Sequence, residues 1–177
     1  MTKKQEKLVS VYLSQFEDET KCLYRTITNF LCELGYYPSK AGASISFKNA
    51  THNKQIAKMG TIIKKNQVSS PKFSLRFSSC QDYSQRFAKL VHDTIIKVTA
   101  NNRYRLARCL TGECSNCCGE PDAHIYKSVL SNGENIASCG VYAIEIPHLT
   151  AGDIDEIKQL INKEHEYLMK HEVNTTV

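Results

Sequence analysis

The sequence lacks the segments that direct a chain into or across a membrane. No apolar run approaches the roughly 20 residues that a membrane-spanning helix needs. The first sixteen residues mix basic and apolar positions, but Ser10, Ser14 and the acidic run 17–19 interrupt the apolar ones, and no small-residue cleavage site follows. We therefore expect a cytoplasmic protein that does not bind a membrane.

The familiar catalytic motifs are missing as well. There is no glycine-rich phosphate loop, no Gly-x-Ser-x-Gly, and no His-x-Glu followed by Pro-Cys-x-x-Cys as in zinc deaminases. His165 and His171 are six residues apart, whereas the metalloprotease helix needs a spacing of four. We interpret these histidines, with Glu164 beside them, as a solvated helix face, and we expect a binding protein rather than an enzyme.

Acidic residues are missing from one long interval. None occurs between Glu33 and Asp82, and residues 1–110 hold 19 Lys/Arg against 7 Asp/Glu, while residues 111–177 hold 4 against 11. A concentrated positive field attracts phosphates and acidic partners. We expect a basic face within residues 34–108 that contacts nucleic acid or an acidic protein. The alternatives are that this face docks on the acidic C-terminal part or is simply solvated. The expected contact residues are Lys48, Lys54, Lys58, Lys64, Lys65, Lys72, Arg76, Arg103, Arg105 and Arg108.

Cysteine, by contrast, is concentrated in one place. Four of the eight cysteines fall between residues 109 and 118, and Cys139 follows in a Cys-Gly pair. Because the cytosol keeps thiols reduced, such a cluster indicates a metal rather than disulfides. A Cys-x-x-Cys turn supplies two ligands to tetrahedral zinc, so we expect Zn²⁺ bound by Cys109, Cys114, Cys117 and Cys139.

Several alternatives to this site stay open. Cys118, which precedes a glycine, can replace Cys117, and His124 can replace Cys109 to give three cysteines and one histidine. Iron–sulfur binding and no metal are the other possibilities. If the cysteines are reactive rather than structural, the protein is an enzyme or a metal-handling or redox protein, with Cys114 and Cys117 as the exchanging pair.

Hydrophobic periodicity predicts an α+β protein with a mixed or antiparallel sheet. We expect a helix pair at 5–16 and 18–34, strands near 43–48 and 72–78, and a middle helix at 81–98 with Ser79 near its N-cap. Residues 56–65 fit a strand or a helix, and Gly60 suggests a bulge. A short strand at 104–108, a hairpin of 124–130 with 136–146, and a final helix opened by Thr150 and Asp153 complete the list. Residues 1–177 form one domain in this prediction, with a metal-stapled subregion at 103–146.

Two resemblances rest on short strings. PKFSLRF at 71–77, DYSQRF at 82–87, and CSNC followed by CGVYAIEIP resemble small uncharacterised bacterial proteins with a C-terminal cysteine knuckle. The order of elements over the first hundred residues is similar to that of the YdhG-like domain, one branch of which is linked to iron handling. The resemblances imply no substrate.

Overall fold

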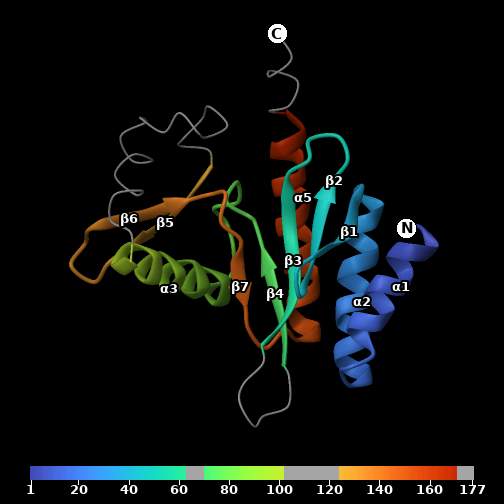
Figure 1. Ribbon diagram of the computed structural model, residues 1–177. Coiled ribbons are helices and arrows are strands. Elements are labelled where there is room, and N and C mark those ends of the chain that lie inside the picture. The colour runs from blue at the N-terminus through green and yellow to red at the C-terminus, as the bar shows by residue number, and fades with distance from the viewer. Residues whose placement is uncertain (63–69, 102–123, 171–177) are drawn as a thin grey trace.

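The computed structural model describes residues 1–62, 70–101 and 124–170. In this part of the chain, four α-helices accompany a five-stranded antiparallel sheet and a separate two-stranded one (Figure 1). The predicted α+β class is confirmed. The large sheet has the order β1-β2-β3-β4-β7, formed by Tyr36–Ala41, Ser44–Asn49, Gln55–Ile62, Ser70–Leu75 and Ile144–Ile146.

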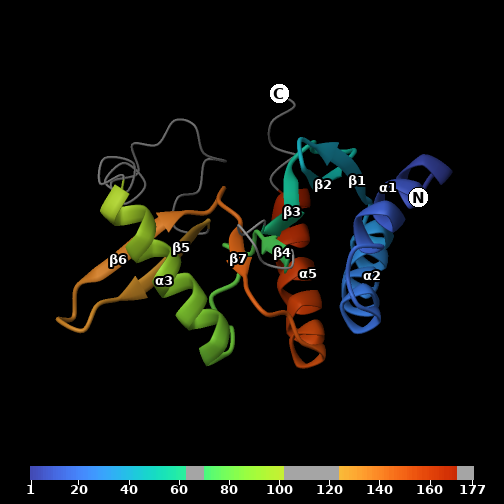
Figure 2. The same ribbon diagram turned by 60° about the horizontal axis from the view of Figure 1, so that its bottom comes forward.

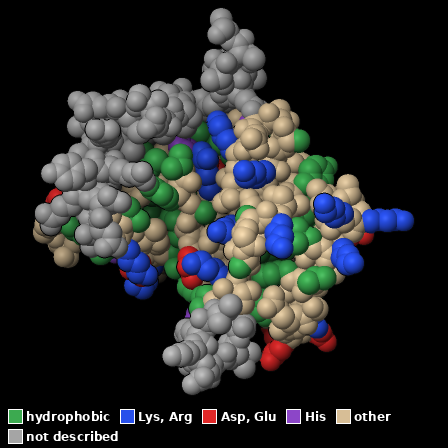
Figure 3. All heavy atoms as spheres, viewed as in Figure 1, with side chains coloured by type: hydrophobic (Ala, Val, Ile, Leu, Met, Phe, Trp, Pro, Cys, Tyr) green, Lys and Arg blue, Asp and Glu red, His purple; other side chains and the backbone are tan. Residues whose placement is uncertain are grey.

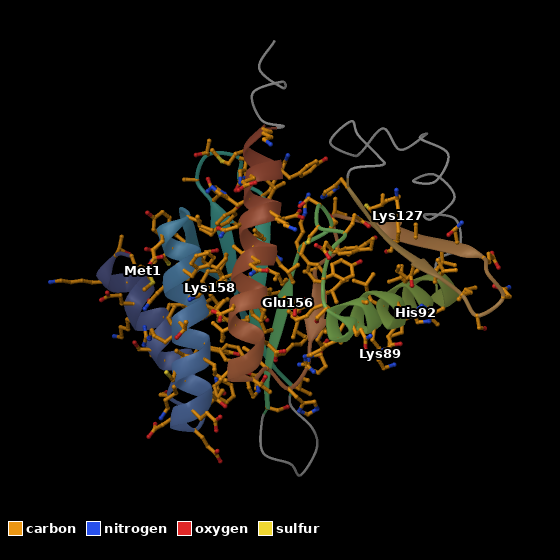
Figure 4. All side chains as sticks on the ribbon, turned by 180° about the vertical axis from the view of Figure 1, so that it is seen from behind. Met1, Lys89, His92, Lys127, Glu156 and Lys158 are labelled. Carbon is orange, nitrogen blue, oxygen red and sulfur yellow. The ribbon has the colours of Figure 1, made fainter. Side chains whose placement is uncertain are left out.

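The helices cover one face of this sheet. The N-terminal pair α1 (Lys3–Leu13) and α2 (Asp18–Glu33) lies beside β1, and α5 (Ile154–Lys170) packs next to α2. From behind, α5 crosses in front of the strands, and Lys158 lies on its side toward α2 (Figure 4). The Lys158 ammonium stands 5.7 Å from the centre of the Phe30 ring on α2.

Strand register explains why the described helices cover only one face. One row across four strands joins Ile45, Met59, Phe73 and Ile146, and all four side chains are buried against the helices. The neighbouring row joins Ser46, Lys58, Ser74 and Glu145 and points the other way, because successive residues of a strand alternate between faces. The sheet therefore has an apolar covered face and a polar face that no described helix covers, which we call the open face.

The two-stranded sheet forms a separate layer with the middle helix. Strands β5 (Ile125–Val129) and β6 (Asn135–Cys139) form the predicted hairpin, and α3 (Gln85–Asn101) packs across it (Figure 2). Tyr126 joins this layer to the large sheet: its hydroxyl accepts from the Phe77 amide at 3.0 Å and donates to the Tyr142 carbonyl at 3.1 Å. Burial raises the pKa of Tyr126 well above its usual value, so the hydroxyl stays protonated.

Several predicted boundaries were wrong for identifiable reasons. Residues 36–41, for which no element was predicted, form β1, where Pro38 is tolerated because β1 is an edge strand. Residues 136–146 were expected as one strand but are split between β6 and β7, in different sheets. Residues 55–62 form a strand, and its bulge lies opposite Phe47 and Lys48 rather than at Gly60.

Of the two predicted helix caps, one is confirmed and the other is wrong. The predicted capping box of Thr150 and Asp153 is present, and it opens the short 3-10 turn η2 (Ala151–Asp153) that leads into α5. Ser79 does not cap α3, because its amide and hydroxyl both donate to Glu164. Ser84 takes that place, since its hydroxyl accepts from the Phe87 amide. The predicted strand at 104–108 lies outside the described residues.

Candidate functional site

The open face of the large sheet carries a diagonal row of lysines. Lys58 stands on β3, and Lys48 on β2 and Lys72 on β4 lie two residues to either side of its cross-strand partners, Ser46 and Ser74. Lys58 and Lys72 are regular diagonal neighbours, which are about 7–8 Å apart. Lys48 lies across the β-bulge, where its register partner is Gln55. Figure 3 shows Lys and Arg side chains over this face. We call Lys48, Lys58 and Lys72 the lysine row.

Little negative charge opposes this row. Glu145 is the only acid among the five strands of the large sheet. It forms an ion pair with Lys72, and both side chains are about two-fifths exposed, at 41% and 42%. Exposed ion pairs of this kind contribute little free energy, so Lys72 can exchange Glu145 for another anion. Lys48 and Lys58 have no acidic partner among the residues that the structure describes.

A hydrophobic core lies on the other face, and a buried ionic cluster interrupts it. Arg76, just past the end of β4, places its Nε 2.6 Å from Oε1 of Glu164 on α5. His124, which precedes β5, contacts the Arg76 guanidinium and lies 3.5 Å from the same carboxylate oxygen. Its ring stacks on Tyr167 of α5, with ring centres 5.1 Å apart. These contacts connect the end of β4, the residue before β5 and helix α5, which are distant in the sequence.

The Glu164 carboxylate is held in its charged form. Burial alone raises the pKa of a carboxyl group, but the hydrogen bond with His124, the Arg76 charge and the Ser79 amide outweigh that effect, and the pKa is lowered. Its second oxygen accepts from the Ser79 amide and hydroxyl, each at 3.0 Å. We therefore assign this cluster a structural role, since Glu164 and His124 are completely buried.

A second buried polar group joins β1, the β2–β3 turn and α5. The Tyr36 hydroxyl lies 3.2 Å from His52 Nε2 and 3.2 Å from His165 Nδ1. Since His52 Nδ1 accepts from the Lys54 amide, His52 Nε2 carries the proton and donates to Tyr36, which donates to His165. Burial, with the Lys54, His165 and Arg76 charges, lowers the pKa of His52 to about 4, so the ring is neutral.

The candidate metal ligands fall mostly outside the described residues. Cys109, Cys114, Cys117 and Cys118 lie there. Cys139 ends β6 as a free, half-buried thiol and packs against Ile125. His124 belongs to the ionic cluster, and it precedes Ile125, so its ring points to the other face of the hairpin. No group of three or more potential metal ligands occurs among the described residues.

The predicted basic contact residues also lie partly inside and partly outside the described part of the chain. The lysine row lies on the open face, and Lys54 lies in the loop between β2 and β3. Arg76 does not join them, because it is 6% exposed and Glu164 neutralises its charge. Lys64, Lys65, Arg103, Arg105 and Arg108 lie outside the described residues.

Sequence reasoning missed the two buried polar groups. Glu164 and His165 were interpreted as a solvated helix face, which is wrong for Glu164 because it is completely buried. A signal was present: Glu164 stands three residues after Ile161 and four before Leu168, both on the apolar side of the helix. A carboxylate in an apolar stripe needs a buried cation. Nothing local marks Tyr36 or His52 in this way.

Comparisons with known proteins add nothing to this picture. The chain matches no protein-family model, no curated protein and no solved structure. The proposed resemblances therefore stay predictions. No helix in the described part of the chain is long and apolar enough to span a lipid bilayer.

Proposed function

We propose that the protein binds single-stranded nucleic acid on the open face of its five-stranded sheet. The observation that carries this proposal is the lysine row, which crosses three adjacent strands on a face that no described helix covers. Lysines spaced along a flat surface can each neutralise a phosphate of one strand and release its counterions.

Two features favour nucleic acid over an acidic protein. Tyr37 stands directly opposite Lys48 at the edge of the face and is 40% exposed, so its ring is available to stack on a base. The centre of the face consists of serine, lysine and glycine, whereas the centre of a protein interface is usually apolar. Binding without catalysis also agrees with the complete burial of Glu164 and His124.

Removal of the lysine row tests this proposal. Binding of a dye-labelled oligothymidylate of about 12 nucleotides is measured by fluorescence anisotropy at low salt. The triple variant Lys48→Ala, Lys58→Ala, Lys72→Ala is expected to bind at least about tenfold more weakly. The control variant Lys3→Ala, Lys4→Ala, Lys7→Ala removes the same charge from the exposed side of α1 and is expected to change affinity less than about twofold. Equal losses in both variants would contradict the proposal.

We also propose a structural zinc ion held by Cys109, Cys114, Cys117 and Cys139. The support is the position of Cys139, a free thiol at the end of β6, next to the hairpin residue Ile125. Ile125 lies at the start of β5, shortly after the cysteine-rich stretch of the sequence. A metal bound there would tie that stretch to the hairpin. Elemental analysis of Cys139→Ser protein tests this proposal, because loss of a ligand should lower the zinc content.

A further inference from the structure

The open face is hollowed beside the lysine row. The hollow has a volume of about 290 Å³ and is lined by Ser44, Lys58, Gly60, Thr61, Lys72, Ser74 and Ala143. It exists because Gly60 has no side chain: a Cβ there would lie only 2.9 Å from the Ser44 hydroxyl. Serine and glycine therefore form much of its lining, and two ammonium groups border it.

Ser74 contributes to the lining of this hollow. It is a largely buried residue, 8% exposed. The hydroxyl of Ser46, in the same cross-strand row, is already engaged, since it donates to the Gln55 side chain at 2.7 Å. Because Ser74 lines the hollow, its hydroxyl can donate to a group that enters it.

The charges around the hollow suit an anion. Lys58 has no acidic partner in the described part of the chain, and Lys72 is shared with the partly exposed Glu145. The two lysines are diagonal neighbours on adjacent strands, so both can reach one small anion between them. Glu145 opposes such an anion, since its carboxylate competes for Lys72.

We infer that the hollow binds a phosphate monoester, and, on the proposed function, that this group is the terminal phosphate of the bound strand. A terminal phosphate carries a charge of about −1.5 to −2 and three strong acceptor oxygens. Lys58 and Lys72 supply the matching charge, and Ser44 and Ser74 supply hydroxyl donors. A phosphodiester within the strand has one charge and is attached at both ends, so it fits this set of donors less fully.

The first test compares two oligothymidylates that differ only in a 5′-phosphate. Wild-type protein is expected to bind the phosphorylated strand about tenfold more tightly. Gly60→Val fills the hollow and leaves the lysines in place, so it is expected to abolish this preference, and the two strands should then bind with equal affinity. Valine favours strands, and thermal unfolding checks that the variant folds. Ser39→Val, on the same face in β1, is the matched control and keeps the preference.

A second test does not depend on nucleic acid binding. Methyl phosphate is titrated while the backbone amide signals of Ser44, Gly60 and Ser74 are followed by nuclear magnetic resonance. Saturable shifts at these residues in wild type, lost in Gly60→Val and strengthened in Glu145→Gln, support the inference. Their absence overturns it, as does equal affinity for the two oligonucleotides. Loss of all oligonucleotide binding with methyl phosphate shifts intact overturns only the proposed function.

Discussion

Arg76 and Glu164 form an ion pair inside the protein. Arg76 Nε lies 2.6 Å from Glu164 Oε1, and the exposed fractions of the two side chains are 7% and 0%. Arg76 follows β4 and Glu164 lies in the middle of α5, so the pair fixes the final helix against the sheet. Removal of one member leaves the other charge buried without its counterion.

Neutralising Glu164 should therefore destabilise the fold strongly. We expect Glu164→Gln to lower the free energy of unfolding by about 3–5 kcal/mol, because the Arg76 charge stays buried. Urea denaturation followed by circular dichroism measures this change. Glu166→Gln, an exposed position on the same helix, is the control and should change stability by less than about 0.5 kcal/mol. A similar small effect for both variants would show that the pair does not anchor α5.

Acidification should weaken the fold through His52. Its folded-state pKa of about 4 lies below the usual histidine value, so between these values the unfolded chain binds more protons and stability falls as pH falls. The expected loss from this residue between pH 7 and pH 5 is about 2 kcal/mol. His165 acts in the same direction because burial lowers its pKa. Below pH 5, protonation of Glu164 should lower the stability of the fold further, since its pKa is also lowered.

The variant His52→Asn isolates this contribution. Its unfolding free energy, measured by urea denaturation at each pH, should change less between pH 7 and pH 5 than that of wild type. An unchanged pH dependence would mean that His52 is not held neutral by its surroundings.

Gly140 is expected to tolerate no side chain. A Cβ at this position would lie 2.4 Å from the His124 carbonyl oxygen and 2.4 Å from the Ser78 hydroxyl. Because the carbonyl belongs to the backbone, Gly140→Ala must displace the hairpin from the sheet, and we expect a loss of about 2–3 kcal/mol. Gly152→Ala is the control, since its nearest neighbour would be 3.7 Å away. Equal melting temperatures for the two variants would contradict this close approach.

One zinc ion per chain is the expected result of elemental analysis of untagged protein. Cys139→Ser should lower the zinc content and expose additional thiols to a colorimetric reagent, because a structural site needs all four ligands. Cys22→Ser, an exposed position on α2, is the control and should retain the metal. Full zinc content in Cys139→Ser would remove Cys139 from the ligand set.

Sequence periodicity predicted the helices well because each buries one apolar stripe. The stripe of Ile154, Ile157 and Ile161 placed α5 correctly, and the alternation around Phe73 placed β4. It could not predict which strands share a sheet, since β6 and β7 follow each other closely yet pair with different partners. That choice depends on contacts between residues distant in the sequence.

Charge patterning predicted only part of the candidate site. The acid-free interval predicted a basic face, but Lys58 and Arg76 look alike in the sequence while one is exposed and the other is buried beside Glu164. The difference depends on α5, which contributes the counterion from almost ninety residues further along the chain. Likewise, the hollow at Gly60 arises only when β2, β3 and β4 lie side by side.

The salt dependence of oligonucleotide binding tests the central claim most directly. Each phosphate neutralised on a single strand contributes about −0.7 to the slope of log K against log salt concentration. We predict that the triple variant Lys48→Ala, Lys58→Ala, Lys72→Ala has a slope shallower than that of wild type by about 2, because three phosphate contacts are lost. Identical slopes for the two proteins would show that the open sheet face does not contact the phosphates.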